Sequence, residues 1–379
     1  MKRYVDMVRR MNWWLTAAMA ALAVISVCFI YSASYRGPGE PMPGYWKMQI
    51  VWFAIGLGLY LAVLAVDYRR ICQWSTVWYA LAVGALVLVL VTGAKVYGAR
   101  RWLGWHGLGI QPSEVAKLAV AVAVAYYLFH RAPEQRQRWS TVWGAWAIVA
   151  VPAALIFLQP DLGSVVLLTV MTMGMLFAAG VRLKHLAVVA LAGVLLAAVV
   201  LPVLWRIKER QTGRRSYQKE RLLVFLHPER DLTGAGWNLN QSLIAVGSGG
   251  LTGKGFLQGT QNLLGYLPRT VAPNDFLFSV IAEEKGFAGS VCVLGLYAVL
   301  LGSGLRIASE ARDRLGMLLA TGIVVLLFSH VFINIGMTIG LMPVKGLPLP
   351  LLSYGGSFVL ATMTALGLLQ NVWIHRRDY

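Results

Sequence analysis

The 379-residue chain is 58% hydrophobic and only 13% charged, with a formal net charge of +18. Soluble domains carry about twice that share of charged residues and fewer apolar ones. The composition therefore excludes an ordinary soluble protein and predicts an all-α, polytopic integral membrane protein. Membrane topology accounts for much of the basic excess, so we expect no nucleic-acid partner.

Ten apolar runs are long enough to cross a bilayer, which takes about 20 helical residues each. The first opens with two tryptophans suited to the membrane interface and is longer than the apolar core of a secretory signal, so we interpret it as a retained transmembrane helix. The runs cover residues 12–32, 46–66, 74–92, 114–130, 141–159, 162–180, 184–205, 275–305, 316–342 and 348–373.

Basic residues set the expected orientation of these spans. With the N-terminus inside, every short cytoplasmic segment is basic, as the positive-inside rule requires; Arg69–Arg70 and Arg376–Arg377 are examples. Both termini are then cytoplasmic. The long segment 206–274, between spans seven and eight, is extracytoplasmic, and we expect it to form short interfacial helices within a single membrane domain covering 1–379.

Two adjacent arginines on a short outer loop run against this rule. Arg100 and Arg101 lie between Gly93 and Glu114, among glycines and aromatic residues. Guanidinium groups match the geometry of phosphate oxygens, so we predict that this pair binds an anionic ligand. Simple attraction to the headgroups of membrane lipids is the alternative.

Charged residues also open the fourth and sixth spans. Glu114 and Lys117 are three residues apart and share one helix face, where pairing lowers the cost of holding both in the membrane. We predict an ion pair that fixes helix packing, with a part in shaping a polar cavity as the alternative. Asp161, which follows Gln159 and Pro160, is placed to cap the sixth helix.

The eighth span holds the most unusual set of ionisable residues. From Gly286 to Leu305 there are 20 residues, or about 30 Å of helix, enough to cross the hydrocarbon. Asp275 then stands at headgroup level at the expected start of the helix, as a cap, a catalytic group or both. On a continuous helix Glu283 lies about 80° from Asp275, nearer to its face than Glu284.

The motifs taken together resemble those of the SEDS family (shape, elongation, division and sporulation) across essentially the whole chain. Within the family, the stretch 253–261 resembles the elongation subfamily, RodA, whereas 345–347 is closer to the division subfamily, FtsW. The motifs are Ala99–Leu103 with Gln111–Glu114 and Lys117, Gln159–Gly163, Gly247–Gly250, Asp275–Phe276 with Ala282–Glu284, and Pro348–Ser357.

The resemblance implies a peptidoglycan glycosyltransferase that polymerises lipid II at the outer face of the bacterial cytoplasmic membrane during cell elongation. It also implies a class B penicillin-binding protein as transpeptidase partner. The family's essential aspartate falls on Asp275, although the preceding loop is two residues longer here and lacks the family's glutamate and histidine.

The same resemblance implies roles for the site residues. Asp275 is the expected general base for the attacking sugar hydroxyl. Arg100, Arg101 and Lys117 are expected to stabilise the pyrophosphate, directly or through a divalent cation such as Mg or Mn. We expect the substrate site to include three further residues, Glu114, Glu283 and Ser353.

Other functions fit ten helices with charges at membrane depth. A flippase or other transporter of lipid-linked precursors places its site near the bilayer midplane, whereas Asp275 and the arginine pair map to the outer face. A non-catalytic scaffold for cell-wall enzymes explains the helices but not the polar cluster. Within the family, an FtsW-like division paralogue is the alternative.

Overall fold

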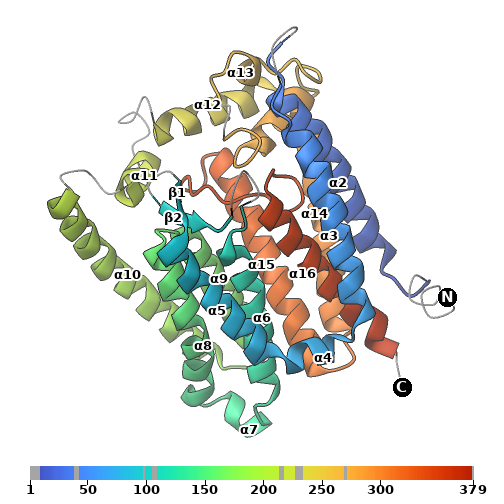
Figure 1. Cartoon of the computed structure of the whole chain (residues 1–379), viewed down its shortest axis with the longest axis vertical. Coiled ribbons are helices and arrows are strands. Elements are labelled where there is room, and N and C mark those ends of the chain that lie inside the picture. The colour runs from blue at the N-terminus through green and yellow to red at the C-terminus, as the bar shows by residue number, and fades with distance from the viewer. Residues whose placement is uncertain are drawn as a thin grey trace.

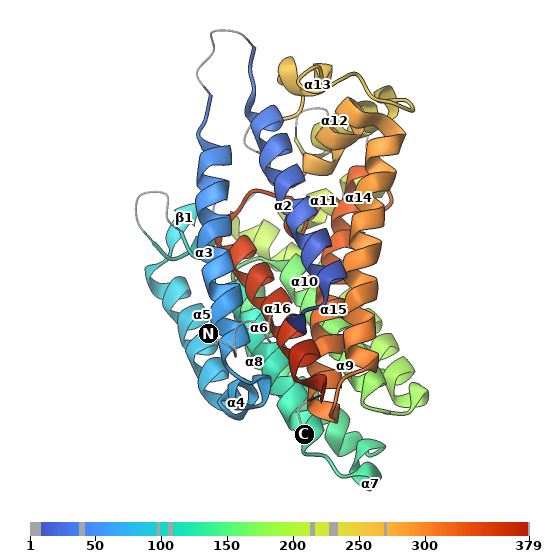
Figure 2. The same cartoon turned by 90° about the vertical axis from the view of Figure 1, so that its right-hand side faces the viewer.

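The computed structural model describes residues 9–37, 42–96, 99–104, 109–212, 217–226, 234–268 and 271–377. Helices stand at all ten predicted positions and form an upright bundle (Figure 1; Figure 2). The prediction of a polytopic all-α membrane protein is confirmed. The helices are α2 (Trp13–Ser34), α3 (Tyr45–Ala65), α5 (Ser75–Thr92), α6 (Pro112–Phe129), α8 (Trp139–Leu158), α9 (Leu162–Ala178), α10 (Leu183–Thr212), α14 (Leu277–Ser309), α15 (Arg314–Thr338) and α16 (Gly356–Ile374).

Shorter elements define the two ends of the bundle (Figure 1). The end drawn at the top, here the upper end, carries an antiparallel hairpin and three short helices. The lower end carries two short helices and the turn between α14 and α15. The upper elements are β1 (Ala94–Val96), β2 (Ala99–Trp102), α11 (Tyr217–Leu226), α12 (Ala235–Ser248) and α13 (Thr260–Leu263), and the lower helices are α4 (Tyr68–Gln73) and α7 (Pro133–Arg136).

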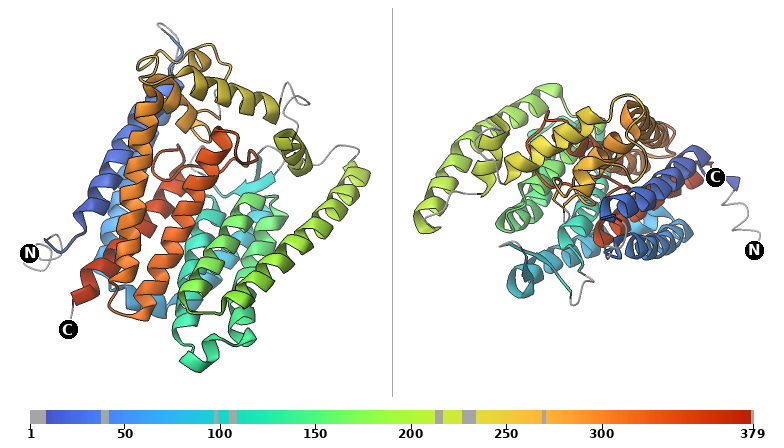
Figure 3. Two further views of the ribbon diagram at one scale, coloured as in Figure 1. Left: turned by 180° about the vertical axis from the view of Figure 1, so that it is seen from behind. Right: turned by 90° about the horizontal axis from the view of Figure 1, so that it is seen from above.

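Burial divides the long helices into a centre and a periphery. In the most apolar stretch of α16, 89% of residues are buried, and the corresponding share is 72% for α6 and for α15. In α10 only 6% are buried, and Figure 3 shows this helix at the edge of the bundle. Polar side chains on the central helices are therefore shielded from lipid by protein, which is where membrane proteins tolerate them.

Aspartate and asparagine caps fix where several helices begin. The Asn12 side chain accepts a hydrogen bond from the Leu15 amide at 3.2 Å at the start of α2. At the start of α9, the predicted cap is confirmed, since the Asp161 carboxylate accepts from the Ser164 amide at 3.1 Å. Each cap satisfies an amide that has no partner within its own helix.

The segment 206–274 begins later than predicted, but it contains short helices as predicted. Its first residues continue α10 as far as Thr212, and α11 and α12 cover the two apolar stretches that predicted short helices. The hairpin of β1 and β2 is an addition to the all-α prediction. It is a local feature of the loop that precedes α6.

The central loop, residues 343–355, is the least regular part of the interior. It joins α15 to α16, and the last span therefore begins at Gly356 rather than at 348. Its buried main-chain groups need partners, because unpaired ones are costly away from water. Side chains from four helices supply them: Asn334 and His330 of α15 donate to the carbonyls of Leu347 and Pro348, Tyr297 of α14 to Pro350, Ser26 of α2 to Leu352, and Gln49 of α3 to Ser353.

The eighth span is not the continuous helix that the sequence predicts. Gly286 has φ 63° and ψ −158°, so α14 is broken into a short buried part, Leu277–Lys285, and a long part. Glycine adopts such a conformation without a steric penalty, whereas other residues do not. The sequence pattern hid the break because both parts are apolar.

A glycine-rich loop, residues 249–255, repairs the hydrogen bonds that the break removes. In a continuous helix the amides of Phe287 and Ala288 would bond the carbonyls of Glu283 and Glu284. Each of these groups instead finds a partner in the glycine-rich loop. Phe287 N–H donates to Gly250 O (2.8 Å) and Ala288 N–H to Leu251 O (3.0 Å), while Lys254 N–H and Gly255 N–H donate to Glu283 O and Glu284 O (both 3.0 Å).

We predict that Gly286→Ala destabilises the protein by at least about 1–3 kcal/mol, the usual cost of a strained backbone conformation. A Cβ there would also lie 2.4 Å from the Gly253 nitrogen. Gly295→Ala, in the long part of the same helix, is the control, because its Cβ meets nothing within 4 Å. Thermal unfolding in detergent tests this, and equal melting temperatures for the two variants would contradict it.

Candidate active site

Asp275 lies in a short turn held against the central loop at the upper end. Its amide donates to the Val271 carbonyl at 2.9 Å, which closes the turn. From the central loop, the Tyr354 amide donates to the Pro273 carbonyl at 2.9 Å. From α15, the Asn334 side chain donates to the carbonyl of Asp275 at 3.0 Å and to that of Leu347 at 2.6 Å. The turn is thus fixed on two sides by residues distant in sequence.

The predicted helix cap at Asp275 is wrong. Phe276 occupies the cap position of α14, without a side-chain capping bond, and the helix begins at Leu277. Because Asp275 precedes the helix, the estimate of 80° between it and Glu283 does not apply. The two residues stand at opposite ends of the short part of α14. The carboxylate of Asp275 is therefore not used to terminate this helix.

The carboxyl group of Asp275 and the guanidinium group of Arg221 both lie next to Gly346. A Cβ built on Gly346 would lie 3.0 Å from Oδ2 of Asp275 and 3.7 Å from Nη1 of Arg221. Burial raises the pKa of Asp275 to about 6, against the opposing effect of the Arg221 charge. Burial disfavours the ionised carboxylate, whereas the neighbouring cation favours it. This carboxyl group therefore exchanges its proton near neutral pH.

Lys345 directly precedes that glycine in the central loop and is a further basic residue of this end of the bundle. Its side chain is half-buried, and burial lowers its pKa, opposed by the charge of Asp161. Within the described part of the chain, Lys345 has no hydrogen bond and no ion pair. The loop around it packs on the start of α9, where a Cβ on Gly163 would lie 2.9 Å from Leu347. Because among the described residues only the charge of Asp161 acts on it, without a hydrogen bond or ion pair, this ammonium group remains available to an anion.

The predicted arginine pair holds the hairpin to the helices below it. Arg101 donates from Nε to the Gln159 carbonyl at 2.7 Å and from Nη2 to the Pro160 carbonyl at 2.6 Å. Arg100 donates from Nη1 to the carbonyls of Leu90 and Val91, at 3.2 and 3.1 Å. Both side chains thus satisfy carbonyl groups at helix C-terminal ends. Substrate binding by this pair stays a prediction.

The predicted ion pair of Glu114 and Lys117 is confirmed, and the structure adds a histidine to it. Lys117 Nζ lies 2.8 Å from a carboxylate oxygen of Glu114 and 3.0 Å from Nε2 of His330, all three residues being buried. Since Nδ1 of His330 lies 3.2 Å from the Pro348 carbonyl, which only accepts, Nδ1 carries the proton and Nε2 accepts from Lys117. The histidine thereby connects the pair to the central loop.

Glu283 and Ser353, both predicted to contact substrate, are fully buried and bonded within the protein. The Glu283 carboxylate accepts from Lys254 Nζ at 2.7 Å and from Thr260 Oγ1 and the Gln261 amide at 3.0 Å. Ser353 Oγ accepts from the Leu349 amide at 2.8 Å inside the central loop. Substrate contacts of Glu283 and Ser353 stay predictions. In the structure, the hydrogen bonds of these two residues hold loops in place.

Comparison with known proteins agrees with this arrangement. Residues 11–378 match the FtsW/RodA/SpoVE family, described as "Cell cycle protein". The chain belongs to this family. It is 36% identical over 359 residues to the peptidoglycan glycosyltransferase MrdB of Escherichia coli (strain K12), with 95% of this chain and 92% of that protein covered.

Solved structures of the FtsW/RodA/SpoVE type share the fold. A chain of a peptidoglycan synthase complex, studied for the coordination of polymerization and crosslinking, has a TM-score of 0.79 and 29% identity, covering 97% of this chain and 99% of that one. The Rod shape determining protein RodA of Thermus thermophilus has a TM-score of 0.70 and 29% identity, covering 97% of this chain and 98% of that one. The shared fold extends over nearly the whole chain.

In this family member, the structure brings together some predicted residues and separates others. Asp275 is joined by Arg221, and Lys345 directly precedes the glycine against which the Asp275 carboxyl group lies. Neither Arg221 nor Lys345 was predicted as a site residue. Lys345 carried a sequence signal, since it is a lone lysine in a proline-rich break between two apolar spans. His330 carried a weaker sequence signal: it lies four residues before Asn334 and therefore on the same helix face. Arg221 had none, because the 206–274 segment contains many basic residues.

Metal ligands of the usual kind do not gather at this site. Among the residues that the structure describes, no group of three His, Cys, Asp or Glu side chains is placed to hold a metal ion. Mg²⁺, however, is usually bound by one or two carboxylates together with substrate phosphates and water. Asp275 is the side chain here that fits such an arrangement.

We predict that Glu114→Gln or Lys117→Gln alone destabilises the protein by about 3–5 kcal/mol, because each leaves one buried charge without its partner. The double variant, with both residues changed to Gln, should regain part of that loss. Glu310→Gln, at an exposed pair with Arg306, is the control and should cost less than about 1 kcal/mol. Melting temperatures test this, and a double variant less stable than both singles would contradict it.

Proposed function

We infer that this chain is a peptidoglycan glycosyltransferase that extends glycan strands from lipid II. The relatives named for this activity support the inference along nearly the whole chain. The observation that carries the proposal for the site is the half-buried carboxyl group of Asp275, held against Gly346 beside Arg221. Polymerisation of purified lipid II by the purified protein, with and without its partner, is the direct test.

The proposed reaction is one displacement at an anomeric carbon. A sugar hydroxyl oxygen of one chain forms a bond to that carbon, and the bond from the carbon to the lipid pyrophosphate breaks. The hydroxyl proton passes to Asp275, and the electron pair leaves with the pyrophosphate. General bases work best when their pKa lies near the working pH, and a pKa of about 6 for Asp275 suits this role.

The leaving pyrophosphate needs a positive partner as its charge grows. We propose Lys345 for this role, since it directly precedes Gly346, against which the Asp275 carboxyl group lies, and its half-buried ammonium group forms no hydrogen bond or ion pair within the described residues. A cation held in a partly desolvated site stabilises developing negative charge more than one in water. Arg101 and Arg100, which bond carbonyl groups here, then support the hairpin that borders the site.

A divalent cation would supply the same stabilisation as a Lewis acid. The residue that would hold it is Asp275. The remaining ligands would come from the substrate phosphates and water. This chain's own contribution to the reaction does not depend on that ion, because Asp275 and Lys345 already provide the base and the cation.

The site lies at the upper end, which we assign to the outer face of the bacterial cytoplasmic membrane. The short loops of the lower end are basic, and the positive-inside rule assigns them to the cytoplasm together with both termini. On this assignment the segment 206–274 is extracytoplasmic and belongs to the single membrane domain 1–379. The phosphates of a lipid-linked substrate lie at the depth of such a site.

The structure favours an enzyme over a transporter of the same lipid. The charges nearest the bundle centre, on Glu114 and Lys117, bond each other and His330 rather than facing a substrate path. We further propose that a class B penicillin-binding protein is the partner, supported by the synthase complex that shares this fold. The 253–261 stretch favours elongation over division, and it contacts Glu283 through Lys254.

We predict that Asp275→Asn abolishes glycan polymerisation from lipid II, with a loss of at least about 10²–10⁴-fold, because an amide cannot take up the proton. Asp67→Asn is the matched control. That residue caps α4 at the lower end, where asparagine caps equally well, so full activity is expected. Wild-type polymer yield from Asp275→Asn, in a protein of unchanged melting temperature, would contradict the proposal.

The pH profile gives this experiment a second readout. With a raised pKa of about 6, Asp275 is protonated at lower pH, so the rate should fall about tenfold per pH unit below that value. The residual activity of Asp275→Asn should lack this dependence. If Asp275→Asn shows the same pH dependence as the wild-type protein, a residue other than Asp275 is the titrating group.

We predict that Lys345→Gln lowers kcat/KM for lipid II by about 10²–10³-fold, the usual effect of removing one group that stabilises a developing anion. Lys345→Arg should retain more activity, because it keeps the charge. Lys184→Gln at the lower end removes an equal charge far from the site and should be neutral. If Lys345→Gln polymerises at the wild-type rate, the leaving group is stabilised by other residues.

A further inference from the structure

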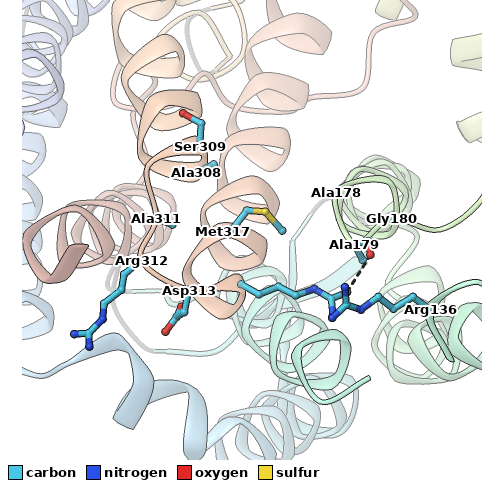
Figure 4. A pocket seen from close by; sticks show the side chains of 11 residues that line it. Arg136, Ala178, Ala179, Gly180, Ala308, Ser309, Ala311, Arg312, Asp313 and Met317 are labelled. Carbon is cyan, nitrogen blue, oxygen red and sulfur yellow. Dashed lines mark hydrogen bonds between the residues drawn. The ribbon is translucent and has the colours of Figure 1, made fainter. Parts of the chain in front are cut away.

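A second polar site lies at the lower end, far from Asp275. A cavity of about 470 Å³ opens there between α7, the end of α9 and the turn from α14 to α15 (Figure 4). Three arginines line it, Arg136, Arg312 and Arg314, with Asp313 as the one acidic residue of the lining. Nothing in the proposed glycosyl transfer uses this cavity.

The single acid does not neutralise these arginines, because its carboxylate is already bound. Asp313 accepts from Arg69 Nε at 2.7 Å, from the Tyr68 hydroxyl at 2.8 Å and from the Gly316 amide at 2.8 Å. Across the described residues, Arg136, Arg312 and Arg314 have no carboxylate partner. The cavity therefore holds a net positive charge that the protein leaves uncompensated.

Two of the guanidinium groups converge on one oxygen atom. Arg136 Nε and Arg314 Nη1 both donate to the Arg131 carbonyl, at 3.3 and 3.2 Å, and Arg314 Nη2 donates to Ala179 O at 3.0 Å. Like charges held this close repel each other, and an anion between them would remove that repulsion. The Nη groups of Arg136 keep N–H bonds to offer, and such forks match phosphate oxygens.

The surroundings of the cavity are those of a membrane interface. Phe177 and Leu183, on either side of the Ala178–Gly180 wall, are 62% and 67% exposed. Trp139 and Trp143, at the start of α8 and at the same end, are 38% and 61% exposed. Exposed apolar chains beside tryptophans are typical of the depth at which lipid headgroups meet acyl chains. These exposed apolar side chains offer a surface for acyl chains next to the arginines.

We propose that the lower cavity binds the phosphate of an anionic phospholipid, with Arg136 and Arg314 as its ligands and the exposed apolar residues along its acyl chains. The leaflet on the cytoplasmic side is rich in anionic lipids, in agreement with the orientation assigned above. This site is separate from the proposed catalytic site, and its occupation stabilises the turn between α14 and α15.

The test measures lipid binding by the purified full-length protein in neutral detergent, by native mass spectrometry and thermal shift. Phosphatidylglycerol should bind and raise the melting temperature, whereas phosphatidylcholine, which has no net charge, should not. Arg136→Gln should weaken phosphatidylglycerol binding by about 10- to 100-fold, and Arg136→Lys by less. Arg138→Gln, an exposed arginine two residues away, is the matched control and should bind normally.

Three results would overturn the proposal. Equal losses in Arg136→Gln and Arg138→Gln would mean diffuse attraction to the basic loops rather than a site. Equal binding of both lipids would remove the role of charge. Inorganic phosphate that protects the wild-type protein as well as phosphatidylglycerol does, and fails to protect Arg136→Gln, would assign the cavity to a soluble anion instead of a lipid.

Discussion

The fold depends on satisfying one stretch of irregular main chain inside a helix bundle. The central loop, 343–355, is buried without helical or strand bonding, so its carbonyl groups must find donors among neighbouring side chains. Asn334 and His330 donate to adjacent carbonyls of the loop from positions one turn apart on α15. Donors on α2, α3 and α14 complete the set, so that the loop joins helices from both halves of the sequence.

The same constraint places Asp275, the proposed general base. Asn334 bridges the carbonyls of Leu347 and Asp275, which fixes the turn before α14 against the loop. Gly346 lies against the Asp275 carboxyl group. A Cβ atom on Gly346 would lie 3.0 Å from Asp275 Oδ2, so a side chain there would crowd the carboxyl group. The proposed general base is thus held on irregular backbone rather than on a helix. Preorganisation comes from the buried polar donors, which have no alternative partner in lipid.

Charged side chains that form ion pairs and those that do not lie in different parts of the bundle. In the centre, Glu114 and Lys117 bond each other, and at the break in α14 Glu283 bonds Lys254. Such pairs fix helices and loops. Lys345 at the upper end and the arginines of the lower cavity instead form no ion pair with a carboxylate within the described residues, although the charge of Asp161 acts on Lys345. On the orientation assigned above, these two sets lie at opposite ends of the bundle.

The sequence by itself determined the ten spans, the class of membrane protein, the cap at Asp161 and the pairing of Glu114 with Lys117. These follow from length, hydropathy and spacing within a single helix, which are local properties. The family motifs added the importance of Asp275. The bonding of Arg101 to Gln159, the place of His330 beside Lys117, and the approach of Arg221 to Asp275 were decided only by tertiary structure. Each joins residues more than 50 positions apart, and the break at Gly286 is stable only because a distant loop supplies the missing hydrogen bonds.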